Sequence, residues 1–177
     1  MDLLDQYDAK ATFFLLGRNI SGREKIIKQI QKRGHEICSH GYDHLNYWKV
    51  SPFHALADIK RGWQTINNAL ELRKKVYPFR PPYGKLNIIC LLYLLARRTP
   101  IIYWTKDSGD SSKKMNNYKI ELLAANAQGT VVLAHDFKRS DEKSEHLILE
   151  SILFALKRAK ENGMRIMTVS ELLNNRK

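Results

Sequence analysis

The sequence predicts an α/β fold built on parallel strands. Short β-rich runs alternate with helical patterns along all 177 residues, which is the arrangement of parallel α/β domains. One run, residues 130–134, is apolar throughout, as strands buried on both faces are. Polar residues follow four of the strands, and parallel folds gather their sites at the carboxyl ends of strands. We expect a single domain over residues 1–177, with either an open sheet or most of a barrel.

The first half of the chain alternates strand, helix, strand and helix. Residues 11–16 predict a strand, and the helix after it has an isoleucine face that Gly34 is placed to end. Residues 35–38 predict the next strand. Ser51 and Pro52 are typical of an N-cap and a first helical position. The apolar stripe of the helix that they open consists of Leu56, Ile59, Trp63, Ile66 and Leu70.

The second half repeats the alternation. The expected strands are residues 76–80, 101–104, 130–134 and 165–169. The expected helices are residues 86–97, 118–127 and 144–161, followed by a short closing helix. The helix over 86–97 is strongly apolar, but it is too short to span a bilayer, which takes about 20 residues. We therefore expect no transmembrane segment, and the acidic first residues indicate no signal peptide within this sequence.

The charge favours anionic partners without specifying one. Thirty Lys and Arg residues against 18 Asp and Glu residues give a net charge of +12. The basic residues are scattered in twos and threes, which is typical of a solvated surface, and no nucleic-acid-binding motif is present. We expect no nucleic-acid partner. Cys38 and Cys90 are too few for a disulfide scaffold and lie in apolar surroundings. Their pairing and the redox compartment stay open.

His40 and His44 form an H-x-x-x-H pair directly after a predicted strand. On a helical turn this spacing places two imidazoles on one face, where they can share one metal ion. The spacing alone is weak, and two unrelated histidines remain the alternative. A catalytic zinc usually takes three protein ligands and a water. A third ligand is therefore needed, and Asp or Glu is the expected type.

Two more strand ends carry residues capable of catalysis. The loop 80–84 begins with Arg80, contains two prolines and ends in glycine, so that it can hold a backbone N–H in a fixed direction for an oxyanion. A plain strand-to-helix turn is the alternative. His135 ends the apolar strand and is either a general acid or a hydrogen-bonded structural histidine. Asp110 or Asp107 could orient its ring, or both could be turn residues.

The motifs, in this order, resemble the polysaccharide deacetylase family of carbohydrate esterases (the NodB-homology domain). The matching stretches are Lys10-Ala11-Thr12-Phe13-Phe14-Leu15-Leu16-Gly17, Gly34-His35-Glu36-Ile37 with Ser39-His40-Gly41-Tyr42-Asp43-His44, Phe79-Arg80-Pro81-Pro82-Tyr83-Gly84, residues 104–110, and Val132-Leu133-Ala134-His135-Asp136. Together they extend across nearly the whole chain. Several ordered motifs are far more specific than any one of them.

The resemblance implies a distorted (β/α) barrel that hydrolyses the N-acetyl group of N-acetylglucosamine polysaccharides, such as peptidoglycan or chitooligosaccharide. It implies that His40 and His44 bind a divalent metal, zinc first, with cobalt or manganese as alternatives. In family terms Arg80 braces the catalytic base, and the Tyr83 N–H helps to hold the oxyanion. By the same resemblance, His135 is the general acid and Asp110 tunes it. Leu133 lines the pocket for the acetyl group.

The sequence departs from the family pattern at two places. The family opens with a strand that ends in T-F-D-D-G, whose aspartates are the base and the third metal ligand, and no such motif occurs here. Ser111 also stands where the family often has tryptophan. We expect an N-terminally truncated barrel without its first strand, which binds metal weakly and turns over poorly. The alternatives are a non-catalytic carbohydrate-binding remnant or a basic nucleic-acid-binding module. By resemblance we expect a monomer of the cell envelope or exterior.

Overall fold

The computed structural model describes residues 1–73, 75–108, 129–135 and 142–175, which fall into two compact units. The central unit is Thr12–Tyr103. The terminal unit combines Met1–Ala11 with Trp104–Lys177.

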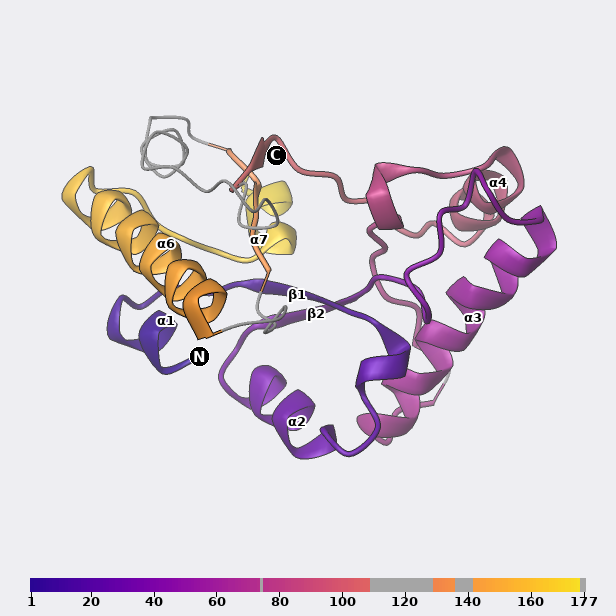
Figure 1. Ribbon diagram of the computed structural model, residues 1–177, viewed down its shortest axis with the longest axis horizontal. Helices are drawn as coiled ribbons and strands as arrows, with labels where there is room; N and C mark the ends of the chain where they lie inside the picture. Colours follow the sequence, from indigo (N-terminus) through magenta and orange to yellow (C-terminus); the bar gives the residue numbers. More distant parts are fainter. Residues whose placement is uncertain (74, 109–128, 136–141, 176–177) are drawn as a thin grey trace. The chain divides into compact units, whose positions relative to one another are not determined.

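Parallel strand pairing organises the central unit. Strand β1 (Thr12–Leu15) pairs with β2 (Glu36–Ser39) from Thr12 opposite Glu36 to Leu15 opposite Ser39 (Figure 1). Two single bridges, Ser39 to Phe79 and Phe79 to Ile101, extend the sheet in the same parallel sense. The expected strands 76–80 and 101–104 thus shrink to one paired residue each. Pro78 and Pro100 lie beside these bridges and lack the N–H that a longer ladder needs.

Helices flank this sheet in the central unit. They are the 3₁₀ turn η1 (Gly17–Asn19), α2 (Glu24–Lys32), α3 (Pro52–Ala69), the 3₁₀ turn η2 (Pro82–Gly84) and α4 (Ile88–Ala96). Helices α3 and α4 lie side by side (Figure 1). The expected Ser51 cap is confirmed, because its hydroxyl accepts a hydrogen bond from the His54 N–H at 3.2 Å. Asn87 caps α4 in the same way, and each cap contributes about 1 kcal/mol.

The core of the central unit lies between the sheet and the helices. Its fully buried large side chains are Tyr47, Ile59, Ile66, Tyr77, Phe79 and Leu94. Cys38 and Cys90 are both completely buried, which agrees with their apolar surroundings in the sequence, and both are free, which the sequence left open. Burial raises the pKa of both thiols. They therefore stay protonated and pack as small apolar groups.

The terminal unit contains a second parallel pair. Its elements are α1 (Asp2–Gln6), β3 (Lys106–Asp107), β4 (Val132–Leu133), α6 (Glu142–Glu161) and α7 (Val169–Asn174). In the β3–β4 pair Asp107 lies opposite Leu133. The expectation that run 130–134 is buried on both faces is wrong, because Val132 is 39% exposed. Within the described residues β4 pairs with this one short strand only. The expected helix 118–127 lies outside the described residues.

The expected strand over 165–169 is also wrong. Residues 164–168 are irregular, and helix α7 begins at Val169. The cause is a capping box at the start of α7. The Thr168 hydroxyl accepts from the Glu171 N–H, and the Glu171 carboxylate accepts from the Thr168 N–H at 2.9 Å. In the described ranges no helix has both the length and the apolar character needed to cross a bilayer.

Gly62 provides a test of how closely α3 packs. A Cβ added there would lie 2.7 Å from the carbonyl carbon and oxygen of Gly41. Replacing an exposed helical glycine by alanine usually stabilises the protein. At Gly62 the overlap of the new methyl group with Gly41 should make the substitution destabilising. We expect Gly62→Ala to lower the free energy of unfolding by about 1–3 kcal/mol in urea titrations. Gln64→Ala, on the exposed face of the same helix, is the control and should be near neutral. A stabilised Gly62→Ala would show that the packing is loose.

Candidate active site

His40 stands where the paired strands β1 and β2 end. Its N–H donates to the Leu15 carbonyl at 2.9 Å, so its backbone is fixed by the sheet. The next residues form a loop and not the helical turn on which the pairing interpretation was based. Positive φ angles at Gly41 (80°) and His44 (59°) turn this loop back. The two imidazoles nevertheless meet, with ring centroids 5.0 Å apart and planes at 70°.

The His40 ring is oriented by the backbone of the neighbouring strand. Its Nδ1 lies 2.7 Å from the Arg80 carbonyl oxygen. Because a carbonyl only accepts hydrogen bonds, Nδ1 carries the proton, and Nε2 is the lone-pair nitrogen of the neutral ring. Histidine ligands in metal sites have this arrangement, in which a carbonyl or carboxylate holds the second ring nitrogen. His40 is therefore in a tautomer able to bind a metal through Nε2.

The buried carboxylate of Asp58 anchors the loop that carries His44. Asp58 projects from α3 and is only 4% exposed. Its oxygens accept hydrogen bonds from the backbone N–H groups of Tyr42 (3.0 Å) and Asp43 (2.8 Å) and from the hydroxyl of Tyr47 (2.7 Å). Burial and the Asp58 charge raise the pKa of Tyr47, so that its hydroxyl remains a donor. A buried carboxylate with three donors is well compensated, and the loop conformation depends on it.

Asp58 is a functional residue that the sequence analysis missed. It lies on the buried face of α3 beside Ala55, Ile59 and Gly62. A carboxylate at a core position of an amphipathic helix signals a polar partner, and this signal was present in the sequence. Gly41 belongs to the same arrangement. A Cβ added to Gly41 would overlap with the Asp58 carboxylate and the Tyr47 hydroxyl. Only glycine permits the close approach at this point.

Arg80 brings a buried positive charge to the same region. Its N–H donates to the Ser39 carbonyl at 3.0 Å, next to His40. The guanidinium donates to the Tyr103 carbonyl at 3.3 Å and lies 3.7 Å from the centroid of the Phe14 ring. Burial lowers the pKa of Arg80 to about 10. Since a buried cation is costly, a carboxylate placed beside it would be strongly favoured.

Tyr83 borders the histidine pair. Its backbone has φ 57° and ψ 12° within η2, and its side chain is 58% exposed. The edge of its ring faces His44, with centroids 4.6 Å apart. Its N–H donates to no acceptor among the described residues, whereas the N–H groups of Gly84 and Lys85 are bonded within the turn. Tyr83 therefore contacts the histidine pair through its ring.

The other predicted site residues belong to the terminal unit. Leu133 lies in β4 opposite Asp107, and half-buried His135 follows two residues later. Asp110 and Ser111 lie outside the described residues. Among the remaining histidines, His35 is buried against Phe13, with ring centroids 5.5 Å apart. The structure thus gathers His40, His44, Arg80 and Tyr83 in the central unit.

The described residues fit two positions of a metal site. No cluster of three or more His, Cys, Asp or Glu side chains that could hold a metal occurs among them. The imidazole pair, with His40 held in its Nε2 lone-pair tautomer, matches the ligand type of a zinc site.

Comparison with known proteins decides the family. Residues 1–95 match the model of the family described as polysaccharide deacetylase. The chain belongs to the polysaccharide deacetylase family. It is 32% identical over 176 residues to a peptidoglycan-N-acetylglucosamine deacetylase of Bacillus cereus, covering 98% of this chain and 79% of that protein. It is 29% identical to a peptidoglycan-N-acetylglucosamine deacetylase of Listeria monocytogenes, of which it spans 34%.

A solved structure supports the same assignment. The Xyl-CE4 domain of a multidomain xylanase from the hindgut metagenome of Trinervitermes trinervoides superposes with a TM-score of 0.83 at 26% identity. The match covers 99% of this chain and 82% of that domain. The expected fold class is confirmed, because the polysaccharide deacetylases share a distorted (β/α) barrel. The family consists of deacetylating hydrolases, which confirms the expected enzyme class.

Asp58→Asn tests the role of the buried carboxylate. An amide cannot accept from all three donors, so that buried N–H groups lose their partners. We expect the free energy of unfolding to fall by about 2–4 kcal/mol in urea titrations. Glu71→Gln removes an exposed carboxylate that pairs with Lys28 and is the control. It should change stability by less than about 1 kcal/mol. Equal effects of the two variants would contradict the anchoring role.

Proposed function

We propose that this chain contributes the histidine pair and the Tyr83 turn to a site that hydrolyses N-acetyl groups of an N-acetylglucosamine polysaccharide. The observation that carries the proposal is the loop that holds the rings of His40 and His44 together, with the Tyr83 ring against His44. Two relatives named as peptidoglycan-N-acetylglucosamine deacetylases favour peptidoglycan as the polymer. Chitooligosaccharide is the alternative substrate.

We propose a divalent metal held by His40 and His44, with zinc first and cobalt or manganese as alternatives. A bound divalent ion polarises the amide carbonyl and activates water. The Arg80 carbonyl keeps the His40 ring in its binding tautomer. We assign to the Tyr83 N–H the role of donor to the substrate oxygen on which negative charge develops. The Arg80 guanidinium braces a carboxylate base, since such an anion offsets the cost of its burial.

We propose that a histidine protonates the leaving amine. Amines leave poorly unless they are protonated, and a histidine titrates in the suitable range. We assign this general-acid role to His135, with Asp110 tuning its ring and Leu133 contacting the acetyl methyl group. Residues 1–177 are proposed to act as one deacetylase domain and as a monomer, on polymer of the cell envelope or exterior.

A carbohydrate-binding remnant without catalysis is the second candidate. The observation in its favour is that the described residues offer two metal ligands and no cluster of three. The sequence also contains no T-F-D-D-G motif for base and third ligand. We accordingly propose that the 177-residue chain binds zinc weakly and has little turnover. A chain with a T-F-D-D-G strand joined ahead of residue 1 should be active.

Zinc titration and acetate release test this proposal. His44→Ala should weaken zinc binding roughly tenfold or more, because even loss of a group that only orients a ligand costs this much. His54→Ala, an exposed histidine on α3, is the control and should leave the zinc affinity unchanged.

Acetate release from peptidoglycan and from chitooligosaccharide should be at least about 100-fold faster for the chain with the added strand, since a general base contributes about 10²–10⁴-fold. Full activity of the 177-residue chain would contradict the need for the aspartates. Sugar binding without acetate release from either chain would favour the remnant.

A further inference from the structure

Helix α4 exposes an apolar stripe on the central unit. Ile88, Leu92 and Leu95 recur at helical spacing on one face, and their side chains are 64%, 58% and 57% exposed. Surface helices of globular proteins usually carry polar residues at such positions. Contiguous exposed apolar surface marks an interaction site more often than isolated apolar residues do.

Two aromatic side chains extend this surface at the start of α4. Trp48 is 67% exposed, and its indole N–H donates to the Leu86 carbonyl at 3.2 Å. Phe53 is 75% exposed and follows Pro52, whose carbonyl oxygen lies 4.0 Å from the Cys90 sulfur of α4. We call the surface formed by Trp48, Phe53, Ile88, Leu92 and Leu95 the α4 face.

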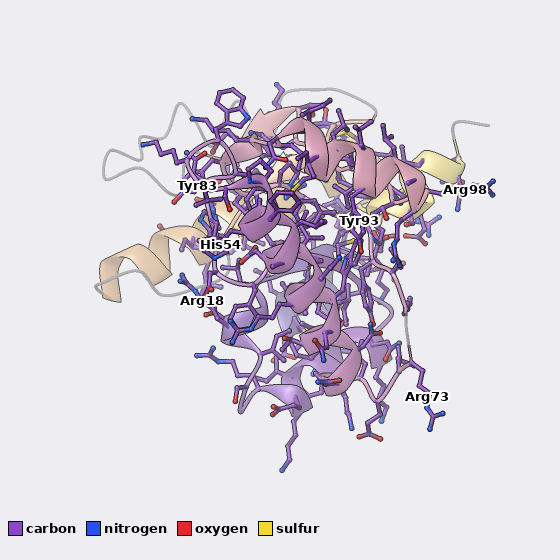
Figure 2. All side chains as sticks on the ribbon, turned by 90° about the vertical axis from the view of Figure 1, so that its right-hand side faces the viewer. Arg18, His54, Arg73, Tyr83, Tyr93 and Arg98 are labelled. Carbon is purple, nitrogen blue, oxygen red and sulfur yellow. The ribbon has the colours of Figure 1, made fainter. Side chains whose placement is uncertain are left out.

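Basic side chains flank the α4 face at both ends. Lys85 precedes the helix, and its Nζ lies 4.9 Å from the centroid of the Trp48 ring. Arg97 and Arg98 follow the helix and are exposed. Figure 2 shows Tyr93 in the middle of the view of α3 and α4, with Tyr83 and Arg98 towards opposite sides. The guanidinium of Arg97 lies 5.1 Å from the centroid of the Tyr93 ring.

The charge of the molecule is concentrated in this unit. Thr12–Tyr103 contains 16 Lys and Arg residues and five Asp and Glu residues, so that it carries +11 of the net charge of +12. Between Leu45 and Tyr103 the acidic residues are Asp58, which is buried under the histidine loop, and Glu71, which pairs with Lys28. Neither carboxylate is available to neutralise the ends of α4.

We propose that the α4 face docks on an anionic lipid bilayer. An exposed apolar helix face with basic ends and a tryptophan at its edge fits the interfacial zone, where apolar side chains enter the acyl boundary and cations meet lipid phosphates. Helix α4 has nine residues, so it lies on the surface and does not cross it. The proposal does not depend on the proposed deacetylation.

A second copy of the chain fits this surface less well. A two-fold interface through the α4 face would set Lys85, Arg97 and Arg98 of one copy near the same residues of the other. Two units that each carry +11 would meet there, and the repulsion opposes association. An anionic bilayer satisfies both the apolar surface and the charge.

Vesicle cosedimentation of the full chain tests the proposal. We expect binding to vesicles of equal phosphatidylglycerol and phosphatidylcholine at low salt, and much weaker binding to pure phosphatidylcholine or at high salt. The double substitution Leu92→Gln and Leu95→Gln should lower the partition coefficient on the order of tenfold or more. Its control is Ile26→Gln with Leu72→Gln, two exposed apolar residues elsewhere in the unit, which should have little effect.

A second pair of variants separates the α4 face from diffuse charge. Arg97→Gln with Arg98→Gln should weaken binding about fivefold per residue, and the same charge change at Lys25 and Lys32 of α2 should weaken it less. Failure of the unmodified chain to bind anionic vesicles overturns the proposal. Equal losses from both charge variants, with no effect of the leucine substitutions, also overturn it. So does a dimer in sedimentation equilibrium that dissociates when Leu92 and Leu95 are replaced.

Discussion

The carboxylate of Asp58 is the group on which the candidate site depends. It is buried under an irregular loop and accepts two backbone N–H groups of that loop and the Tyr47 hydroxyl, while η1 binds the carbonyls of Gly41 and Tyr42 from the other side. Burial makes these bonds strong and makes the loss of one costly. The close approach of Gly41 to Gly62 exists because no side chain separates the loop from α3. The buried Asp58 carboxylate thus fixes the loop that carries the His44 imidazole.

The sheet supplies the other half of the geometry. Parallel pairing through Ser39 and Phe79 brings the ends of two strands together, so that His40 and Arg80 become neighbours although 40 residues separate them. The carbonyl of Arg80 orients the His40 ring, while its guanidinium is buried beside Phe14. Because the chain belongs to the polysaccharide deacetylase family, this arrangement is the candidate active site. The central unit combines the His40 and His44 pair with the Tyr83 turn.

Periodicity predicted α2, α3 and α4, because an apolar face is a local property of the sequence, as is the Ser51 cap of α3. It failed at 165–169, where the capping box of Thr168 and Glu171 starts a helix within a strand-like run. It also overestimated the strands at Phe79 and Ile101, whose length is limited by neighbouring prolines. Motif order found the histidine pair, but spacing could not show that a loop and not a helix joins them. The position of Asp58 on the buried face of α3 marks it as a carboxylate that needs a partner, but its partners, two backbone N–H groups and the Tyr47 hydroxyl, cannot be identified from the sequence.

The central claim is that the buried Asp58 carboxylate holds His40 and His44 in a conformation that binds one metal ion. Zinc K-edge X-ray absorption of the zinc-loaded chain counts the imidazole ligands directly. The account predicts two imidazoles per zinc in the unmodified chain and fewer in Asp58→Asn, measured on samples shown by circular dichroism to be folded. Two imidazoles in both proteins, or none in the unmodified chain, would contradict it.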